Sequence, residues 1–143
     1  MLAFRELKDI LNRTIGWERE LDDLLDVAAV GLKQSESKNL VANLKTRQEE
    51  ILEVLTNINV EDFGPAAWVK FSGDLKREEL IPKKRINRDS APDEILSYVR
   101  EYEEALRDFY TRVADIISTE SQRDLFRSLA QLKTYQIERL VTL

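Results

Sequence analysis

The sequence predicts an all-α fold: a single domain over residues 1–143, folded as an up-down four-helix bundle of two repeated helical hairpins joined by a long crossover. Apolar residues recur at alternating steps of three and four along four long segments, the spacing of one face of a helix. Gly and Pro number only 4 and 3, which is low for a fold of many strands and tight turns. A length of 143 residues fits one domain with a sizeable core.

The first hairpin is predicted over residues 3–58. Its first helix covers about residues 3–33, and its second helix runs to about Ile58. Gly31 and the polar run 34–37 mark the turn between them, and Ser35 or Ser37 is expected to cap the second helix. The inward-facing seam consists of Leu7, Leu11, Thr14, Glu18, Leu21, Leu25, Ala28 and Leu32, followed in the second helix by Val41, Leu44, Gln48, Ile51, Leu55 and Ile58.

Residues 59–90 are predicted to be the crossover. Residues 62–65 form a helix-breaking Asp-Phe-Gly-Pro cluster. The segment from Leu75 to Ile81 is expected to form one or two helical turns that end at Pro82. Trp68 and Phe71 are expected to pack across one end of the bundle or in a dimer contact. A connection this long joins helices that lie parallel, or at opposite ends of a bundle.

The second hairpin is predicted over residues 91–143. Ser90 is expected to cap its first helix, with Pro92 in the first turn and acidic residues against the positive helix end. Residues 118–121 form a second short polar turn. The seam continues as Leu96, Val99, Glu103, Leu106, Tyr110, Val113 and Ile117, and then as Phe126, Leu129, Lys133, Gln136, Leu140 and Leu143.

The two hairpins repeat one another at an offset of 85 residues, with ten identities over 49 gap-free pairs. Trp17 and Tyr102 are a conservative pair under this offset. Two amphipathic segments can share leucines by chance, but here the turn and a polar interruption of the seam also match. The identical pairs are Ile10/Ile95, Leu11/Leu96, Glu18/Glu103, Leu21/Leu106, Asp23/Asp108, Ala29/Ala114, Leu40/Leu125, Leu44/Leu129, Glu53/Glu138 and Leu55/Leu140.

The polar interruption predicts a special layer near the middle of the bundle. Polar side chains on a buried seam are costly unless they are paired or coordinated, so several in one layer suggest a site or the remains of one. The offset relates Glu18 to Glu103 and Gln48 to Lys133. The residues concerned are Glu18, Gln48, Glu103, Lys133 and Gln136.

The layout resembles the rubrerythrin-like branch of the ferritin-like superfamily. Each half of that family has a Glu on its first helix, followed two to three turns later by an aromatic residue and an Ala, and its second helix carries Glu-x-x-His. Here Glu103 precedes Phe109-Tyr110 and Ala114. The resemblance covers both hairpins, about 100 of the 143 residues. It implies a ferritin-like bundle with a di-iron site.

The positions that match the family's metal ligands are Glu18, Gln48, Ile51, Glu103, Lys133 and Gln136. Only Glu18 and Glu103 keep a ligand. Ile51 cannot coordinate, and Lys133 places an ammonium group where a metal ion is expected. This favours a degenerate di-iron site, no cofactor, and a non-catalytic bundle that acts through protein contacts. The alternative is a metal-binding oxidoreductase or iron-handling protein that holds iron or manganese in an atypical carboxylate site.

A structural role explains the same layer without a ligand. Glu103 and Lys133, together with Glu18, are expected to form a buried ion pair backed by Gln48, Gln136 and the Tyr110 hydroxyl. Such a network fixes helix register rather than adding much stability.

Composition narrows the remaining function classes. Cys and His are both 0, which excludes disulfides, thiol catalysis and histidine-based triads. The net charge of −5 argues against nucleic acid as the main partner, and the basic run from Lys70 to Arg88 is expected to be a solvated loop rather than an anion-binding site. The acidic stretch at Asp22, Asp23 and Asp26 lacks the glycine turn of a calcium loop. We expect a cytoplasmic homodimer with a further, unknown protein partner and no membrane association.

Overall fold

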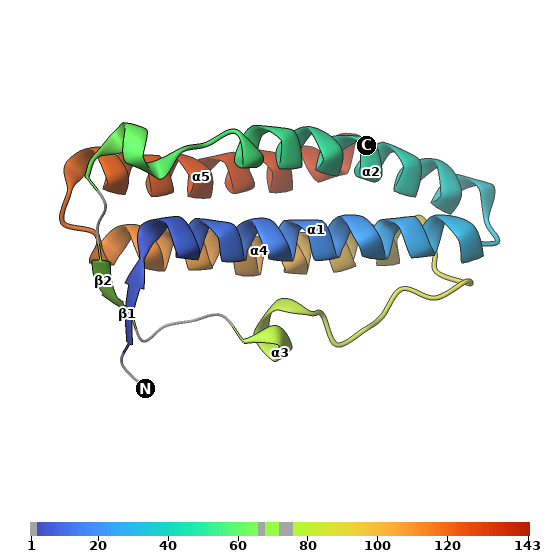
Figure 1. Ribbon diagram of the computed structural model, residues 1–143. Helices are drawn as coiled ribbons and strands as arrows, with labels where there is room; N and C mark the ends of the chain where they lie inside the picture. Colours follow the sequence, from blue (N-terminus) through green and yellow to red (C-terminus); the bar gives the residue numbers. More distant parts are fainter. Residues whose placement is uncertain (1–2, 66–67, 72–75) are drawn as a thin grey trace.

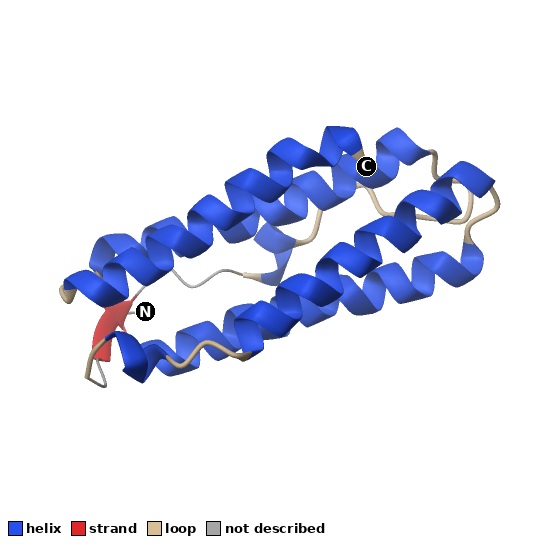
Figure 2. Ribbon diagram, turned by 90° about the horizontal axis from the view of Figure 1, so that it is seen from above, coloured by secondary structure: helices blue, strands red, loops and turns tan. Residues whose placement is uncertain are grey.

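The computed structural model describes residues 3–65, 68–71 and 76–143. Four long helices form the body of the molecule: α1 (Leu7–Gly31), α2 (Ser35–Thr56), α4 (Pro92–Ile116) and α5 (Glu120–Glu138). They run side by side as a bundle (Figures 1 and 2). The all-α prediction is therefore confirmed. The shorter elements are β1 (Ala3–Glu6), η1 (Val60–Phe63), β2 (Trp68–Phe71), α3 (Arg77–Leu80) and η2 (Arg139–Thr142).

A two-stranded ribbon at one end of the bundle was not predicted (Figure 1). Strand β1 pairs antiparallel with β2, with Ala3 opposite Phe71 and Glu6 opposite Trp68. The prediction that α1 begins at residue 3 is therefore wrong, because residues 3–6 are paired strand. Helical periodicity begins only at Leu7, and a local pattern does not reveal a strand partner far along the chain. The side chains of Trp68 and Phe71 lie outside what the structure describes, so their packing stays a prediction.

The helix ends differ from the predicted caps. Gln34 and Ala91 occupy the N-cap positions of α2 and α4, so Ser35, Ser37 and Ser90 do not cap. Instead, the Ser37 hydroxyl donates to the Ser90 carbonyl over 2.7 Å. Pro92 is in the first turn of α4 as predicted. Helix α5 ends at Glu138 and continues as the 3-10 turn η2, in which Leu140 is buried.

The crossover between α2 and α4 runs along the length of the bundle, so that α2 and α4 point in the same direction (Figure 1). Each end of the crossover is fixed to a turn of a hairpin. At its start, the Gln122 amide donates to the Pro65 carbonyl over 2.8 Å. At its end, the Lys33 amide donates to the Arg88 carbonyl over 3.0 Å. One helical turn, α3, forms within the predicted range 75–81, where Leu75 lies outside the described residues.

The core lies between the two hairpins, and most residues of the predicted seams are buried in it. The prediction is wrong for Leu143, which is 42% exposed, and the predicted seam of α4 missed four large buried residues: Ile95, Tyr98, Tyr102 and Phe109. Trp17 of α1 meets Phe109 of α4 edge-to-face at 5.0 Å. The Tyr102 hydroxyl donates to the Trp17 carbonyl over 2.6 Å. Trp17 and Tyr102 are equivalent under the 85-residue offset, and equivalent residues touch where two repeats meet around a pseudo-two-fold axis. The bundle therefore places the middles of α1 and α4 against each other.

Candidate functional site

Every position singled out in the polar layer is buried. Glu18, Glu103 and Tyr110 have no exposed surface, and Ile51 is the most accessible at 8%. Gln48, Lys133 and Gln136 are also buried. The seam periodicity therefore placed these side chains correctly in the core.

Glu18 is held by two other helices. The Lys133 ammonium of α5 lies 2.5 Å from Glu18 Oε1. The Gln48 amide of α2 donates to Glu18 Oε2 over 3.0 Å and to the Glu18 main-chain oxygen over 2.9 Å. Lys133 was predicted to pair with Glu103 together with Glu18, and the Glu103 part of this prediction is wrong. Lys133 makes its ion pair with Glu18 and acts on Glu103 only as a nearby charge.

Glu103 is paired with a residue that the sequence did not single out. The Arg47 guanidinium of α2 forms an ion pair with Glu103 Oε1 and donates to the Gln136 main-chain oxygen over 2.8 Å. Arg47 lies one residue before Gln48, on the flank of the seam, and its side chain is 16% exposed. The sequence did contain a hint of this pairing, because Arg47 is a cation directly beside Gln48, where the apolar seam is interrupted. Gln136 takes part through its backbone rather than through the predicted side-chain support.

Burial raises the pKa of Glu103, and the negative charge of Glu18 raises it further. The positive charges of Lys133 and Arg47 act in the opposite direction. Burial also raises the pKa of Tyr110, again with Glu18 adding to the shift. The Tyr110 hydroxyl makes no hydrogen bond to the described part of the layer. A hydrogen-bonding contribution from the Thr14 side chain lowers the pKa of Tyr110 in turn. The Thr14 hydroxyl itself donates to the Leu11 carbonyl.

The layer balances two carboxylates with two cations, and each ion pair joins one hairpin to the other. A di-iron centre needs free carboxylate and imidazole donors around both ions. Here Glu18 and Glu103 already bind cations, and Lys133 stands at a position where the resemblance to rubrerythrin-like proteins would require a ligand. The donor set therefore does not fit an iron pair. What the arrangement can do is fix the register of the four helices.

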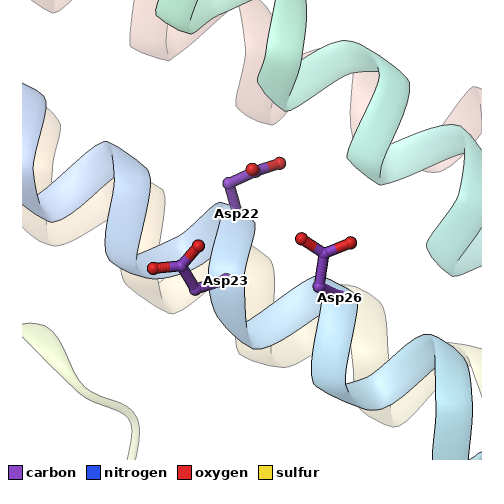
Figure 3. Close-up of side chains that lie close together, drawn as sticks. All are labelled: Asp22, Asp23 and Asp26. Carbon is purple, nitrogen blue, oxygen red and sulfur yellow. The ribbon is translucent and has the colours of Figure 1, made fainter.

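A second acidic group lies on the surface of α1. The carboxylates of Asp22, Asp23 and Asp26 lie close together, as Figure 3 shows. Lys45 of α2 pairs with Asp26 at 2.6 Å and with Asp22 at 3.4 Å. Burial raises the pKa of Asp22, whereas Lys45 lowers it. The cluster is thus partly neutralised by the chain's own cation.

The basic crossover also meets acidic partners. Arg77 pairs with Glu20 of α1, and Lys84 pairs with Glu94 of α4 at 2.9 Å. These two ion pairs neutralise two of the positive charges of the crossover within the molecule. Among the helices that the structure describes, none is both long and apolar enough to cross a membrane.

Searches against protein-family models, curated proteins and solved structures give no significant match for this chain. The resemblance to rubrerythrin-like proteins therefore rests on the chain's own residues.

Proposed function

We propose that this chain is a ferritin-like bundle, similar to rubrerythrin-like proteins, whose metal layer has been replaced by ion pairs and which acts through protein contacts rather than redox chemistry. The observation that carries the proposal is the pairing of both remaining carboxylates. Glu18 binds Lys133, and Glu103 binds Arg47. A metal ion would have to displace both cations and then find its other ligands at Gln48, Ile51 and Gln136.

The connectivity supports the ferritin-like part of this proposal. Two antiparallel hairpins are joined by a crossover that runs the length of the bundle, so that α2 and α4 are parallel (Figure 1). This is the pattern of ferritin-like folds with one long connection. The contact between the equivalent residues Trp17 and Tyr102 is consistent with two related hairpins.

Metal analysis of protein purified without a chelator tests the proposal. We expect less than one iron or manganese ion per chain, because the charge of the layer is already balanced. Two iron ions per chain with an oxo-bridge absorption band would overturn it and favour the oxidoreductase alternative. Lys133→Glu is the informative variant, since it removes the ammonium group from Glu18 and should raise the metal content only if the layer retains a latent site.

The partner that we propose is a second copy of the chain, packed on the outer face of α1. Val27 and Val30 are 74% and 88% exposed. Val27 lines an apolar groove between α1 and Ile86 of the crossover. Asp23 lines this groove on the α1 side, while the neighbouring crossover carries exposed Arg85. In a two-fold contact, the acidic edge of one copy meets the basic edge of the other.

Light scattering after size exclusion tests this contact. The chain has a mass of 16.7 kDa, and we expect a particle of twice that mass. Val27→Asp should shift the particle to the monomer because it places a charge in the apolar groove. Val54→Asp is the matched control, since Val54 is 53% exposed on α2, away from this groove. A monomeric parent protein, or equal effects of the two variants, would contradict the proposed surface.

A further inference from the structure

A pocket of about 400 Å³ opens between α2 and the end of α5, directly beside the ion-pair layer. Its walls come from α2, α5 and η2, and Ile51 and Gln136 of the polar layer belong to its lining. This volume lies in the range of small-molecule sites. The pocket is independent of the proposed dimer surface, which lies on α1 and the crossover.

One wall of the pocket presents positive groups. Arg47 is held in place by Glu103 and by the Gln136 main-chain oxygen, so its guanidinium is preorganised. Those two bonds leave further N–H donors of the guanidinium unused. Arg139 lies over the Tyr135 ring at 5.0 Å and has no carboxylate partner among the described residues. Because Glu103 neutralises the charge of Arg47, the uncompensated positive charge of this wall comes from Arg139.

The same pocket also presents one negative group and an apolar surface. Glu50 lines it and has no ion-pair partner in the described part of the chain. Ile51, Leu132 and Leu143 supply aliphatic surface, and Tyr135 supplies an aromatic ring that is 54% exposed. A ligand that matches these groups needs a carboxylate, an ammonium group and an apolar body.

We propose that this pocket binds a free amino acid with an apolar side chain. The carboxylate bonds to Arg139 and to the unused donors of Arg47, and the ammonium group pairs with Glu50. The side chain packs on Ile51, Leu132 and the Tyr135 ring. A simple anion would leave the charge of Glu50 unpaired, and a simple cation would meet the two arginines, so the charges of the pocket favour a zwitterion.

The experiment compares three probes on the whole protein by NMR titration at neutral pH. L-Phenylalanine carries both charged groups, 3-phenylpropanoate lacks the ammonium group, and 2-phenylethylamine lacks the carboxylate. We expect saturable shifts with L-phenylalanine at about 1 mM or below. We expect 3-phenylpropanoate to bind about threefold to fivefold more weakly and 2-phenylethylamine about tenfold more weakly.

Two exposed side chains allow each charge to be removed without disturbing the core. Glu50→Gln should weaken L-phenylalanine to the level of 3-phenylpropanoate and leave 3-phenylpropanoate itself unchanged. Arg139→Met should weaken both carboxylates and leave 2-phenylethylamine unchanged. Glu53→Gln and Arg127→Met are matched controls, because neither residue lines the pocket. They should bind all three probes like the parent protein.

Three results would overturn the proposal. One is the absence of saturable shifts with L-phenylalanine up to about 10 mM. Another is equal binding of 3-phenylpropanoate and L-phenylalanine, which would mean that Glu50 recognises nothing. The third is an unchanged affinity in both Glu50→Gln and Arg139→Met, which would place the ligand elsewhere. Urea unfolding of each variant checks that the fold is intact.

Discussion

The two hairpins are built alike at their ends and differently in their middles. Ser37 and Gln122 are equivalent under the 85-residue offset, and each fixes one end of the crossover through a main-chain carbonyl. The equivalent spacing in α1 and α4 places Arg13 over Trp17 at 5.3 Å and stacks Tyr98 with Tyr102 at 6.5 Å. These shared contacts support a common pattern for the two halves.

The polar layer breaks this symmetry. Glu18 is matched by a cation with 1% exposed surface, whereas its equivalent Glu103 is matched by Arg47, which is 16% exposed. Gln48 and Lys133 are equivalent positions, yet both bind Glu18. Both carboxylates are fully buried, but the cation that binds Glu18 is buried too, whereas the cation that binds Glu103 lines a pocket. Two buried carboxylates at equivalent positions can therefore differ in how much stability is lost when the partner cation is removed.

The largest expected effect comes from removing Lys133. Lys133→Met leaves the Glu18 charge buried without its cation, and we expect a loss of about 3–5 kcal/mol in the free energy of unfolding. Arg47→Met should cost less, roughly 1–3 kcal/mol, because the nearby positive charge of Lys133 still acts on Glu103 in this variant. Urea unfolding at neutral pH measures both losses.

Gln136→Leu is the control for this comparison. Only the main-chain oxygen of Gln136 receives a hydrogen bond from Arg47, and its side-chain oxygen is buried without a partner in the described structure. We expect a change within about 1 kcal/mol. Equal small losses in all three variants would mean that water hydrates the polar layer and that the two ion pairs contribute equally to the free energy of unfolding.

Completing the metal-ligand set of rubrerythrin-like proteins at the six matching positions sharpens the comparison. Gln48→Glu, Ile51→His, Lys133→Glu and Gln136→His together create two Glu-x-x-His pairs, each on one face of a helix. Without metal, the clustered carboxylates should destabilise this variant. Cobalt(II) at about 100 times its Kd should then add about 2.7 kcal/mol, as a rise in melting temperature would show.

Arg47 makes that test asymmetric. In the variant with four substitutions, Arg47 would still form its ion pair with Glu103 and compete with the metal ion. Adding Arg47→Leu should therefore tighten cobalt binding further. A melting temperature that ignores cobalt in both variants would mean that the six positions do not converge on one site, and the ferritin-like register would then be wrong.

The sequence predicted the helices and the buried layer because both depend on local periodicity. Glu18, Glu103 and Lys133 interrupt a repeating seam, and a one-dimensional pattern is sufficient to place them in the core. The pairing of Lys133 with Glu18, and the role of Arg47, depend on which helix faces which and on how far a long side chain reaches. The β1–β2 ribbon was missed because its strands are far apart along the chain.

The charge of Glu103 predicts a pH dependence. Its pKa is raised from the ordinary value of 4.5, so the folded state holds the proton more tightly than the unfolded chain. The stability that this group contributes is present below pH 4.5 and is lost as the pH rises through the folded-state pKa. Each unit of pKa difference corresponds to about 1.4 kcal/mol.

Glu103→Gln removes this titration. The free energy of unfolding of the parent protein, minus that of the variant, should therefore decrease from pH 4.5 towards neutrality. Glu101→Gln, at an exposed position on the same helix, is the control. Parallel curves for Glu103→Gln and the parent would show that burial does not perturb this carboxyl.

The smallest effects should separate two tyrosines on α4. Tyr102 donates its hydroxyl to the Trp17 carbonyl, so Tyr102→Phe leaves a buried acceptor without its donor and should cost about 1 kcal/mol. The Tyr110 hydroxyl is buried without a hydrogen bond to the described residues, so Tyr110→Phe should change stability by less than about 0.5 kcal/mol or increase it. Urea unfolding of the two variants measures the difference directly. A larger loss for Tyr110→Phe would mean that this hydroxyl is bound within the layer, and the contact between Trp17 and Tyr102 would then not be the stronger link between the hairpins.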